Sequence, residues 1–275
     1  MRNALVVVLA LGTVVTVGHA QSMAEVTDQL MVMQMGMETD TMEMHTISAN
    51  GRSRADTHTR GGMLAQMWGA NSSQIMNPRD SAMGMIIVNH DKKTYSTLDF
   101  SKMFDSSGNI LGGAGGNVKI DPSEDSSSVD SLGPGPVIAG HATLHFRTRS
   151  ISHMTMAFMG QNATMRSEMT SDLFIAPDIR TEGDSSKSAR MQSLFGPGMM
   201  ARAGNKIGRA TSEIAKKGTT LRMATETVIH IGEMTQTQRM SVETLSYKRM
   251  VVPDSVFAIP AGYTRTEGFF GMPPG

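Results

Sequence analysis

Apolar and polar residues alternate along most of the chain, and this period of two restricts what the chain can fold into. The clearest stretch extends from Gly140 to Phe158. Its even positions are mainly apolar and its odd positions mainly polar, as in Leu144, Phe146, Met154 and Met156 against His141, His145, Arg147, Arg149 and His153. Successive side chains of a β-strand point to opposite faces of its sheet. The stretch therefore predicts a long strand with one apolar face and one polar face.

The same alternation recurs often enough to predict a β protein of roughly eight or nine strands. We expect a hairpin partner for this strand over residues 165–175, after a turn at Gly160-Gln161-Asn162. Further strands are expected near residues 27–38, 41–60, 85–90, 94–100, 219–233 and 236–252. Strands joined in sequence by hairpins favour a meander that curls on itself. The predicted fold is mainly β, with a curved antiparallel sheet forming an unclosed half-barrel.

Three segments break the alternation and predict loops or helices. Residues 105–136 combine glycine-rich and serine-rich stretches and predict flexible loops. Residues 184–217 predict helical pieces, the last of them near Thr211–Lys217 and ended by Gly218. Residues 61–80 predict another helix. We expect these few short helices to cover the concave face of the sheet.

Residues 1–20 have the order of a secretory signal peptide. Arg2 precedes an apolar run over residues 4–17, and Gly18-His19-Ala20 forms a small-residue cleavage site. The run is shorter than the roughly 20 apolar residues that a membrane-spanning helix needs. We therefore expect cleavage after Ala20 and export to the periplasm or out of the cell. Residues 21–275 are then expected to form a single soluble domain without an integral membrane segment.

Composition narrows the classes of function. The chain has no cysteine, which excludes disulfides, a cysteine-linked lipid anchor and thiolate metal sites. It has 25 basic and 25 acidic residues, a balance that argues against a nucleic-acid partner. Its 27 methionines stand against only 5% aromatic residues. Methionine is flexible and polarisable, so it suits irregular interiors and surfaces that adapt to several ligands.

Methionine occupies alternate positions at residues 31–37, where the side chains of a strand would project to one side. Together with the apolar face of the 140–158 strand, these residues predict the wall of a hydrophobic ligand site. The residues of this wall are Met31, Met33, Met35, Met37, Met154, Met156 and Phe158. A flexible wall can repack around ligands of different length.

The same thioethers leave a second interpretation open, a binding site for Cu(I) or Ag(I), because soft thioether sulfur selects Cu(I). Residues two apart on a strand are separated by about 6.6 Å, so their sulfurs must lean together to share one ion. His45 follows Met44 and His153 precedes Met154, so each histidine is expected on the strand face opposite its neighbouring methionine. We assign no metal ligand from the sequence.

Enzyme signatures are missing from the sequence. It has no Gly-x-Ser-x-Gly, His-Glu-x-x-His, Ser-x-x-Lys or Gly-x-x-x-x-Gly-Lys-Ser/Thr motif. The glycines at 112–116 lack a following lysine, and residues 121–130 lack the order of a calcium loop. His141 and His145 would be about 13 Å apart on a strand, too far to share one metal. The sequence favours a non-enzymatic protein without a cofactor.

Two segments resemble a known family. They are Ile138-Ala139-Gly140-His141 and Val252-Pro253-Asp254-Ser255-Val256-Phe257-Ala258-Ile259-Pro260-Ala261-Gly262-Tyr263. They look like those of an uncharacterised family of bacterial signal-peptide proteins, a domain of unknown function similar in architecture to LolA-like lipoprotein carriers. The resemblance extends over most of residues 21–275. It implies a strongly curved antiparallel sheet, helices over its concave face and an apolar cavity.

These observations favour an exported protein that binds a hydrophobic small molecule or lipid, such as an acyl chain. Two other functions stay open. One is a methionine-rich protein that binds Cu(I) or Ag(I). The other is a structural or interaction module whose sheet face contacts another envelope protein.

Overall fold

The computed structural model describes residues 21–60, 62, 65, 69–76, 84–99, 117–158, 161–180 and 213–266, with side chains except at 84, 98–99, 117–125, 154–158 and 161–163. The described chain is mainly strand. In chain order the strands are β1 (Gln21–Met35), β2 (Glu38–Ala49), β3 (Arg52–Arg60), β4 (Asn71–Met76), β5 (Gly84–Asn89), β6 (Thr94–Asp99), β7 (Asn117–Pro134), β8 (Leu144–Phe158), β9 (Gln161–Ala176), β10 (Thr219–Ile231), β11 (Met234–Pro253) and β12 (Thr264–Arg265). One short 3₁₀ helix, η1 (Asp254–Phe257), follows β11.

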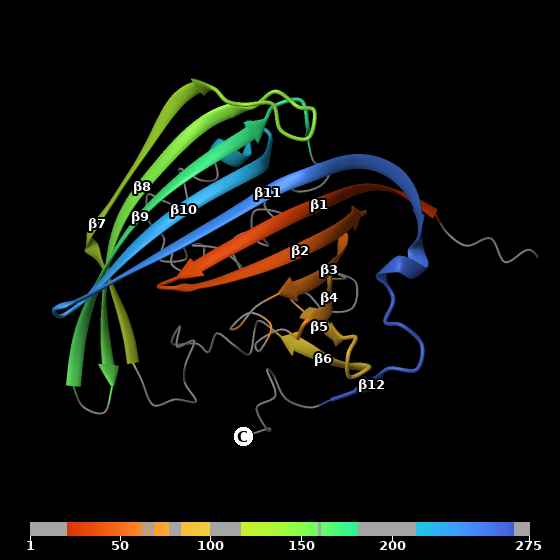
Figure 1. The fold of residues 1–275 in the computed structure, drawn as a ribbon, viewed down its shortest axis with the longest axis horizontal. Coiled ribbons are helices and arrows are strands. Elements are labelled where there is room, and N and C mark those ends of the chain that lie inside the picture. The colour runs from red at the N-terminus through yellow and green to blue at the C-terminus, as the bar shows by residue number, and fades with distance from the viewer. Residues whose placement is uncertain are drawn as a thin grey trace, which may run out of the picture.

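All twelve strands belong to one sheet with the order β12-β6-β5-β4-β3-β2-β1-β11-β10-β9-β8-β7. Two meanders, β1 to β6 and β7 to β11, meet where β1 pairs with β11. Every pairing is antiparallel except the two-residue contact of β12 with β6. The sheet is strongly curved, and its edge strands β7 and β12 do not pair with each other (Figure 1). The expected fold, a curved antiparallel sheet that does not close into a barrel, is confirmed.

The register gives the sheet two chemically different faces. We call the face that holds Met31, Met33 and Met35 the methionine face, and the opposite face the charged face. On β3 the methionine-face positions Ser53, Ala55, Thr57 and Thr59 are all buried, whereas the charged-face positions between them are not. The methionine face is thus the more enclosed side of the sheet.

A helical turn at residues 213–215 shows which face lies inside the curve. Its Ile214 packs against Phe146, Leu173 and Ile175, which are methionine-face residues of β8 and β9. In Figure 1 this turn lies under the arch of β8, β9 and β10. The methionine face therefore lines the inside of the arch, and the turn covers one end of it. This turn, followed by Gly218, agrees with the short helix that the sequence predicts there.

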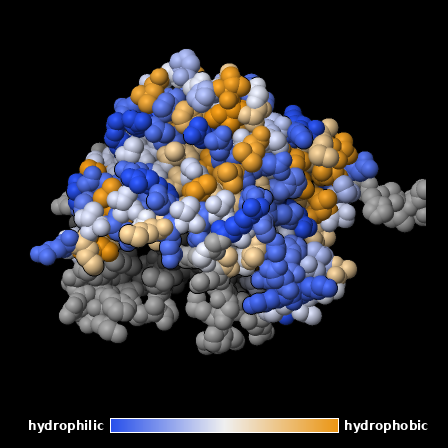
Figure 2. Space-filling model, viewed as in Figure 1, coloured by the Kyte–Doolittle hydropathy of each residue, from blue (hydrophilic) through white to orange (hydrophobic). Residues whose placement is uncertain are grey.

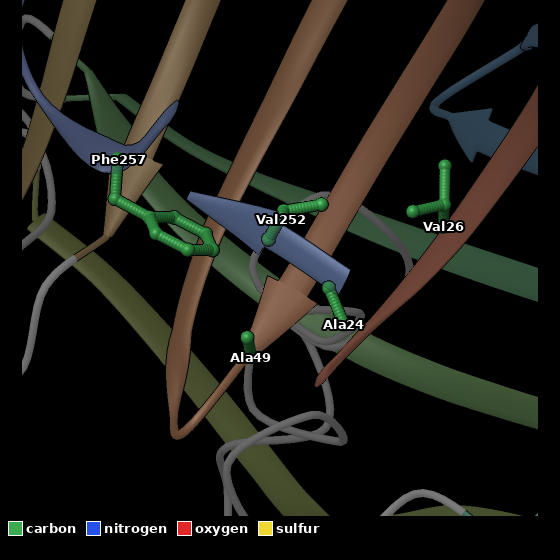
Figure 3. Packing of buried hydrophobic residues seen from close by; sticks show 5 residues of the cluster. All are labelled: Ala24, Val26, Ala49, Val252 and Phe257. Atoms are coloured by element: carbon green, nitrogen blue, oxygen red, sulfur yellow. The ribbon is translucent and has the colours of Figure 1, made fainter. Parts of the chain in front are cut away.

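The largest packing contact on the charged face lies where the chain leaves β11. Ala24, Val26, Ala49, Val252 and Phe257 form a buried cluster between the ends of β1, β2 and β11 and the helix η1 (Figure 3). Burying a side chain of the size of Phe257 stabilises the fold by about 1.5–3 kcal/mol. Packing of η1 thus holds the C-terminal segment against the sheet.

Residues 41–60, expected as one strand, form two. A turn at Asn50 and Gly51, with φ of 52° and 76°, separates β2 from β3. Positive φ at both central residues is the type I′ geometry that Asn-Gly favours in two-residue hairpins. The single-strand prediction was therefore wrong, because the alternation continues across the turn and hides it.

Two further predictions need correction. Residues 61–80, expected as a helix, contain strand β4, although Gly62 and Ala65 before it are helical. Residues 121–134, expected as a loop, belong to edge strand β7. Both strands are rich in serine, which weakens the apolar signal of a strand. The strand count is consequently twelve rather than eight or nine.

The strands expected near 27–38, 85–90, 94–100, 140–158, 165–175, 219–233 and 236–252 are confirmed, with shifted ends. The expected signal peptide at 1–20, the glycine-rich loop at 105–116 and the helical pieces at 184–212 lie outside the described residues.

Candidate hydrophobic ligand site

An uninterrupted row of apolar side chains crosses the methionine face. Because residues directly opposite each other in an antiparallel pair share a face, the register defines this row strand by strand. From β2 to β8 it consists of Met42, Met31, Val242, Met223, Leu173 and Phe146. With neighbouring strands about 4.8 Å apart, the row is roughly 24 Å long. It is an extended apolar track across six strands.

The middle of this track is only partly covered by the chain. Met31, Met33 and Met35 are half-buried although β1 lies between two paired strands at the centre of the sheet. Met42 next to them is buried, as are Leu173 and Phe146 at the other end of the track. Central β1 positions of a closed core would be as inaccessible as these neighbours. The methionines on β1 therefore keep accessible surface.

Three hydroxyl groups beside the track are hydrogen-bonded within the protein, whereas the buried Oγ1 of Thr59, opposite Met42, has no hydrogen-bond partner within the described residues. Ser171 on β9 and Thr225 on β10 are buried, and their hydroxyls lie 2.9 Å apart. Thr244 on β11 is 2% exposed and accepts a hydrogen bond of 3.2 Å from Gln29 Nε2. Internal pairing of this kind lowers the cost of placing polar atoms beside an apolar ligand.

The structure places the sequence-predicted wall residues in three groups. Met31, Met33 and Met35 lie together on the methionine face, as expected. Met37 does not join them, because β1 ends at Met35 and the chain turns at Gly36, which has a φ of 61°. Met37 is fully exposed in that turn, with a relative exposure of 102%. Contrary to expectation, Met37 therefore does not share a strand face with Met31, Met33 and Met35.

The third group lies on β8, where Met154 is opposite Met165 and Met156 is opposite Ala163. Phe158, the last residue of this strand, is opposite Gln161. The side chains of Met154, Met156 and Phe158 are outside the described part of the structure.

Several methionines on the same face were not singled out from the sequence. They are Met42 and Met44 of β2, Met165 and Met169 of β9, Met223 of β10 and Met240 of β11. Each belongs to a predicted strand with visible alternation. What the sequence does not show is that these strands pair so as to bring the methionines onto one face.

The charged face is covered by cross-strand ion pairs. They include Arg60 with Glu43, Arg147 with Asp172, Arg149 with Asp130, Arg222 with Glu243 and Arg239 with Glu226, while Arg54 pairs with Asp56 within β3. Hydrophilic residues are spread over the visible surface of the molecule, with hydrophobic residues between them (Figure 2). These ion pairs lie on the face opposite Met31, Met33 and Met35.

Histidines on this side are bound to carboxylates rather than grouped for a metal. His45 Nδ1 is 2.6 Å from Asp28, and His145 Nε2 is 2.7 Å from Asp172. Hydrogen bonds from His45 and Ser246 lower the pKa of Asp28. Within the described residues, no three His, Asp or Glu side chains are grouped closely enough to hold a metal ion. His45 is on the face opposite Met44, as the sequence predicts.

Tyr247 marks one end of the methionine face, beyond the β-bulge at Asp28 and Gln29. Burial raises the pKa of Tyr247 to about 12, and the nearby Glu25 adds to the increase. The ring of His141 packs edge-on against Tyr247, with 5.6 Å between ring centroids, while its Nδ1 is 2.6 Å from Asp178. The hydrogen bond from His141 is the main cause of the lowered pKa of Asp178. This end of the face is therefore polar.

Comparison with known proteins returned no family model, no curated protein and no solved structure that matches the chain. The described helical segments include none with the length and apolar character needed to cross a membrane.

Proposed function

We propose that this protein is exported and binds a hydrophobic ligand, such as a lipid or acyl chain, on the methionine face without catalysing a reaction. The observation that supports this most directly is the apolar track across six strands, which stays partly accessible at Met31, with the half-buried Met33 and Met35 beside it. Apolar surface that the chain itself leaves uncovered in the interior of a curved sheet gains free energy when a ligand covers it.

Methionine suits this role better than a rigid apolar residue. Its unbranched side chain has three rotatable bonds, so a wall of methionines can adapt to ligands of different shape. The paired hydroxyls of Ser171 and Thr225 leave the surface beside the track with few unsatisfied polar groups. A long apolar molecule can therefore lie across several strands without displacing a hydrogen bond.

The proposal of export rests on residues 1–20 and their signal-peptide order. A carrier of apolar molecules outside the inner membrane would have an envelope lipid or another poorly soluble compound as its substrate. The site would require no metal or cofactor.

A direct test begins with native mass spectrometry of protein purified gently from its own envelope, followed by extraction and identification of bound material. A co-purifying lipid of defined mass is the expected result. Protein that is empty, and that takes up no fluorescent fatty acid afterwards, would contradict the proposal.

A matched pair of variants then locates the site on one face of one strand. Met33→Ser removes apolar surface from the methionine face, and Val32→Ser does so on the opposite face of the same strand. We expect Met33→Ser to weaken fatty-acid binding about tenfold, equivalent to ~1.4 kcal/mol, and Val32→Ser to change it little. Equal effects of both variants would place the ligand elsewhere.

A further inference from the structure

Four methionines from three adjacent strands form two cross-strand pairs near the centre of the methionine face. Met31 of β1 is directly opposite Met42 of β2, and Met33 of β1 is directly opposite Met240 of β11. We propose that Met31 and Met33, together with Met42 or Met240, form a three-thioether binding site for a soft monovalent cation, Cu(I) or Ag(I). This function is separate from the binding of an apolar ligand, because it depends on sulfur rather than on apolar volume.

The cross-strand pairs supply the short distances that a single strand cannot. Met31 and Met33 are two residues apart along β1 and so about 6.6 Å apart. Directly opposed residues have Cβ atoms only about 4.5–5.5 Å apart. Flexible methionine side chains projecting from opposed Cβ atoms can turn their sulfurs toward one point. Met42 and Met240 lie on either side of β1 and are about 11–12 Å apart diagonally, farther than two methionine side chains and one ion can bridge. Met31 and Met33 with either Met42 or Met240 can therefore reach a common ion.

The ligand chemistry selects the ion. Among the described residues no group of three His, Asp or Glu side chains could serve a harder metal. Thioether sulfur is a soft ligand that favours Cu(I), whereas carboxylate and carbonyl oxygens suit Mg²⁺ and Ca²⁺. A site made of thioethers therefore discriminates against zinc, calcium and magnesium.

An acidic residue lies beside the four methionines and can offset the charge of the ion. Thioethers are neutral, so they do not balance the charge of a bound cation. Placing an unbalanced charge in a half-buried site costs free energy. Asp40 is directly opposite Met33 on β2, on the same face, and is 7% exposed. This carboxyl group lies on the same face as the sulfurs, one strand away from Met33.

The test compares two double variants of the purified protein. Met33→Leu/Met240→Leu removes two of the four sulfurs and keeps apolar volume, a type of exchange that usually costs less than about 1.5 kcal/mol. Met37→Leu/Met234→Leu is the control, since Met37 lies in the turn after β1, Met234 is the first residue of β11, and their relative exposures are 102% and 71%. Ag(I) and Cu(I) affinities are measured by native mass spectrometry and by competition with a chromophoric Cu(I) chelator.

We expect one ion per wild-type molecule, affinity weakened at least about tenfold in Met33→Leu/Met240→Leu, and a change within about twofold in the control. X-ray absorption of the copper-loaded wild type should show sulfur ligands, and this measurement does not depend on the folding of any variant. Absence of uptake by the wild type, equal weakening by both variants, or a nitrogen and oxygen ligand set would overturn the proposal.

A fluorescent fatty acid separates this inference from the proposed function. Leucine preserves the apolar track, so fatty-acid binding should persist in Met33→Leu/Met240→Leu while metal binding is lost. Loss of fatty-acid binding in this variant with Cu(I) affinity retained would contradict the sulfur-specific site.

Discussion

At the residue scale, Asp172 accepts three hydrogen bonds on the charged face. Arg147 donates to both of its carboxylate oxygens, at 2.9 and 3.0 Å, and His145 donates to one of them at 2.7 Å. The hydrogen bonds from Arg147 are the main cause of the lowered pKa of Asp172, and His145 adds to the effect. The three residues link β8 to β9 across the sheet.

A lowered pKa makes this contribution depend on pH in one direction. The stabilisation is present above the unfolded pKa of 3.8 and is lost as the pH falls through the folded value. We expect Asp172→Asn to lower the free energy of unfolding by about 1 kcal/mol at pH 7, and by progressively less below about pH 4. Urea denaturation at several pH values measures this.

Glu43→Gln provides the control, because Glu43 and its partner Arg60 are both exposed. Its effect should stay within about 0.5 kcal/mol at every pH. A cost of Asp172→Asn that does not change with pH would show that the carboxylate charge is irrelevant.

Tyr247 should titrate at an unusually high pH, because its pKa is raised in the folded state whereas that of Asp172 is lowered. Burial holds its proton in the folded state to a pKa of about 12, against 10.0 for the free side chain. Its contribution to stability is fully present below pH 10 and is lost as the pH rises through about 12.

The alkaline absorbance of the wild type minus that of Tyr247→Phe isolates this one tyrosine. Glu25→Gln should lower the pKa of Tyr247, because it removes the nearby negative charge. Titration of Tyr247 near pH 10 in the folded wild type would contradict the assigned burial.

At the element scale, the start of β10 depends on a glycine that no other residue can replace. Gly218 has a φ of 152°, and an added Cβ would lie 2.1 Å from the carbonyl oxygen of Ala176. The clash is with backbone, so it cannot be relieved by turning a side chain. The link between the helical turn at 213–215 and β10 therefore passes close to the backbone at the end of β9.

We expect Gly218→Ala to destabilise the protein by more than about 3 kcal/mol, because backbone must move. Gly36→Ala is the matched control, since Gly36 also has a positive φ of 61° but nothing lies within 4 Å of an added Cβ. Gly36→Ala should lower the free energy of unfolding by about 1–2 kcal/mol, which is the cost of left-handed backbone in a non-glycine residue. Thermal melts of both variants check this, and equal costs would refute the close approach.

The elements also show how far the sequence can predict this fold and site. Alternation was sufficient for β8 to β11 and for the methionines of β1. It missed β4 and β7, where serines occupy positions that apolar residues usually mark. The site as a whole could not be predicted from the sequence. Met33 is opposite Met240 only because the register of β1 and β11 shifts at the bulge after Asp28. A shift of one residue would place these methionines on opposite faces.

At the scale of the whole molecule, the C-terminal segment spans the sheet from its centre to its edge. It leaves central strand β11, crosses the charged face as η1 and ends at edge strand β12 (Figure 1). Arg54 Nη1 donates to the carbonyl of Val256 at 3.1 Å. Farther along, the hydroxyl of Tyr263 is 2.8 Å from His90 Nδ1, and His90 Nε2 hydrogen-bonds Ser73.

Tyr263→Phe should loosen this segment without weakening the centre of the sheet. Losing the hydroxyl removes one hydrogen bond, worth about 1 kcal/mol. Hydrogen exchange should accelerate several-fold over residues 258–266, while β1 and β11 keep wild-type protection. Faster exchange throughout β1 would show instead that the segment stabilises the entire sheet.

The pairing of β1 with β11 also determines when this chain can fold. Residues 21–35 of β1 pair with residues 238–253 of β11. The seam between the two meanders can therefore form completely only after residue 253 has left the ribosome. Contacts between such distant segments raise the contact order and slow folding. A newly made chain of this topology keeps this seam unformed for longer, and a chain without stable tertiary structure is the form in which a polypeptide can be threaded through a secretion channel.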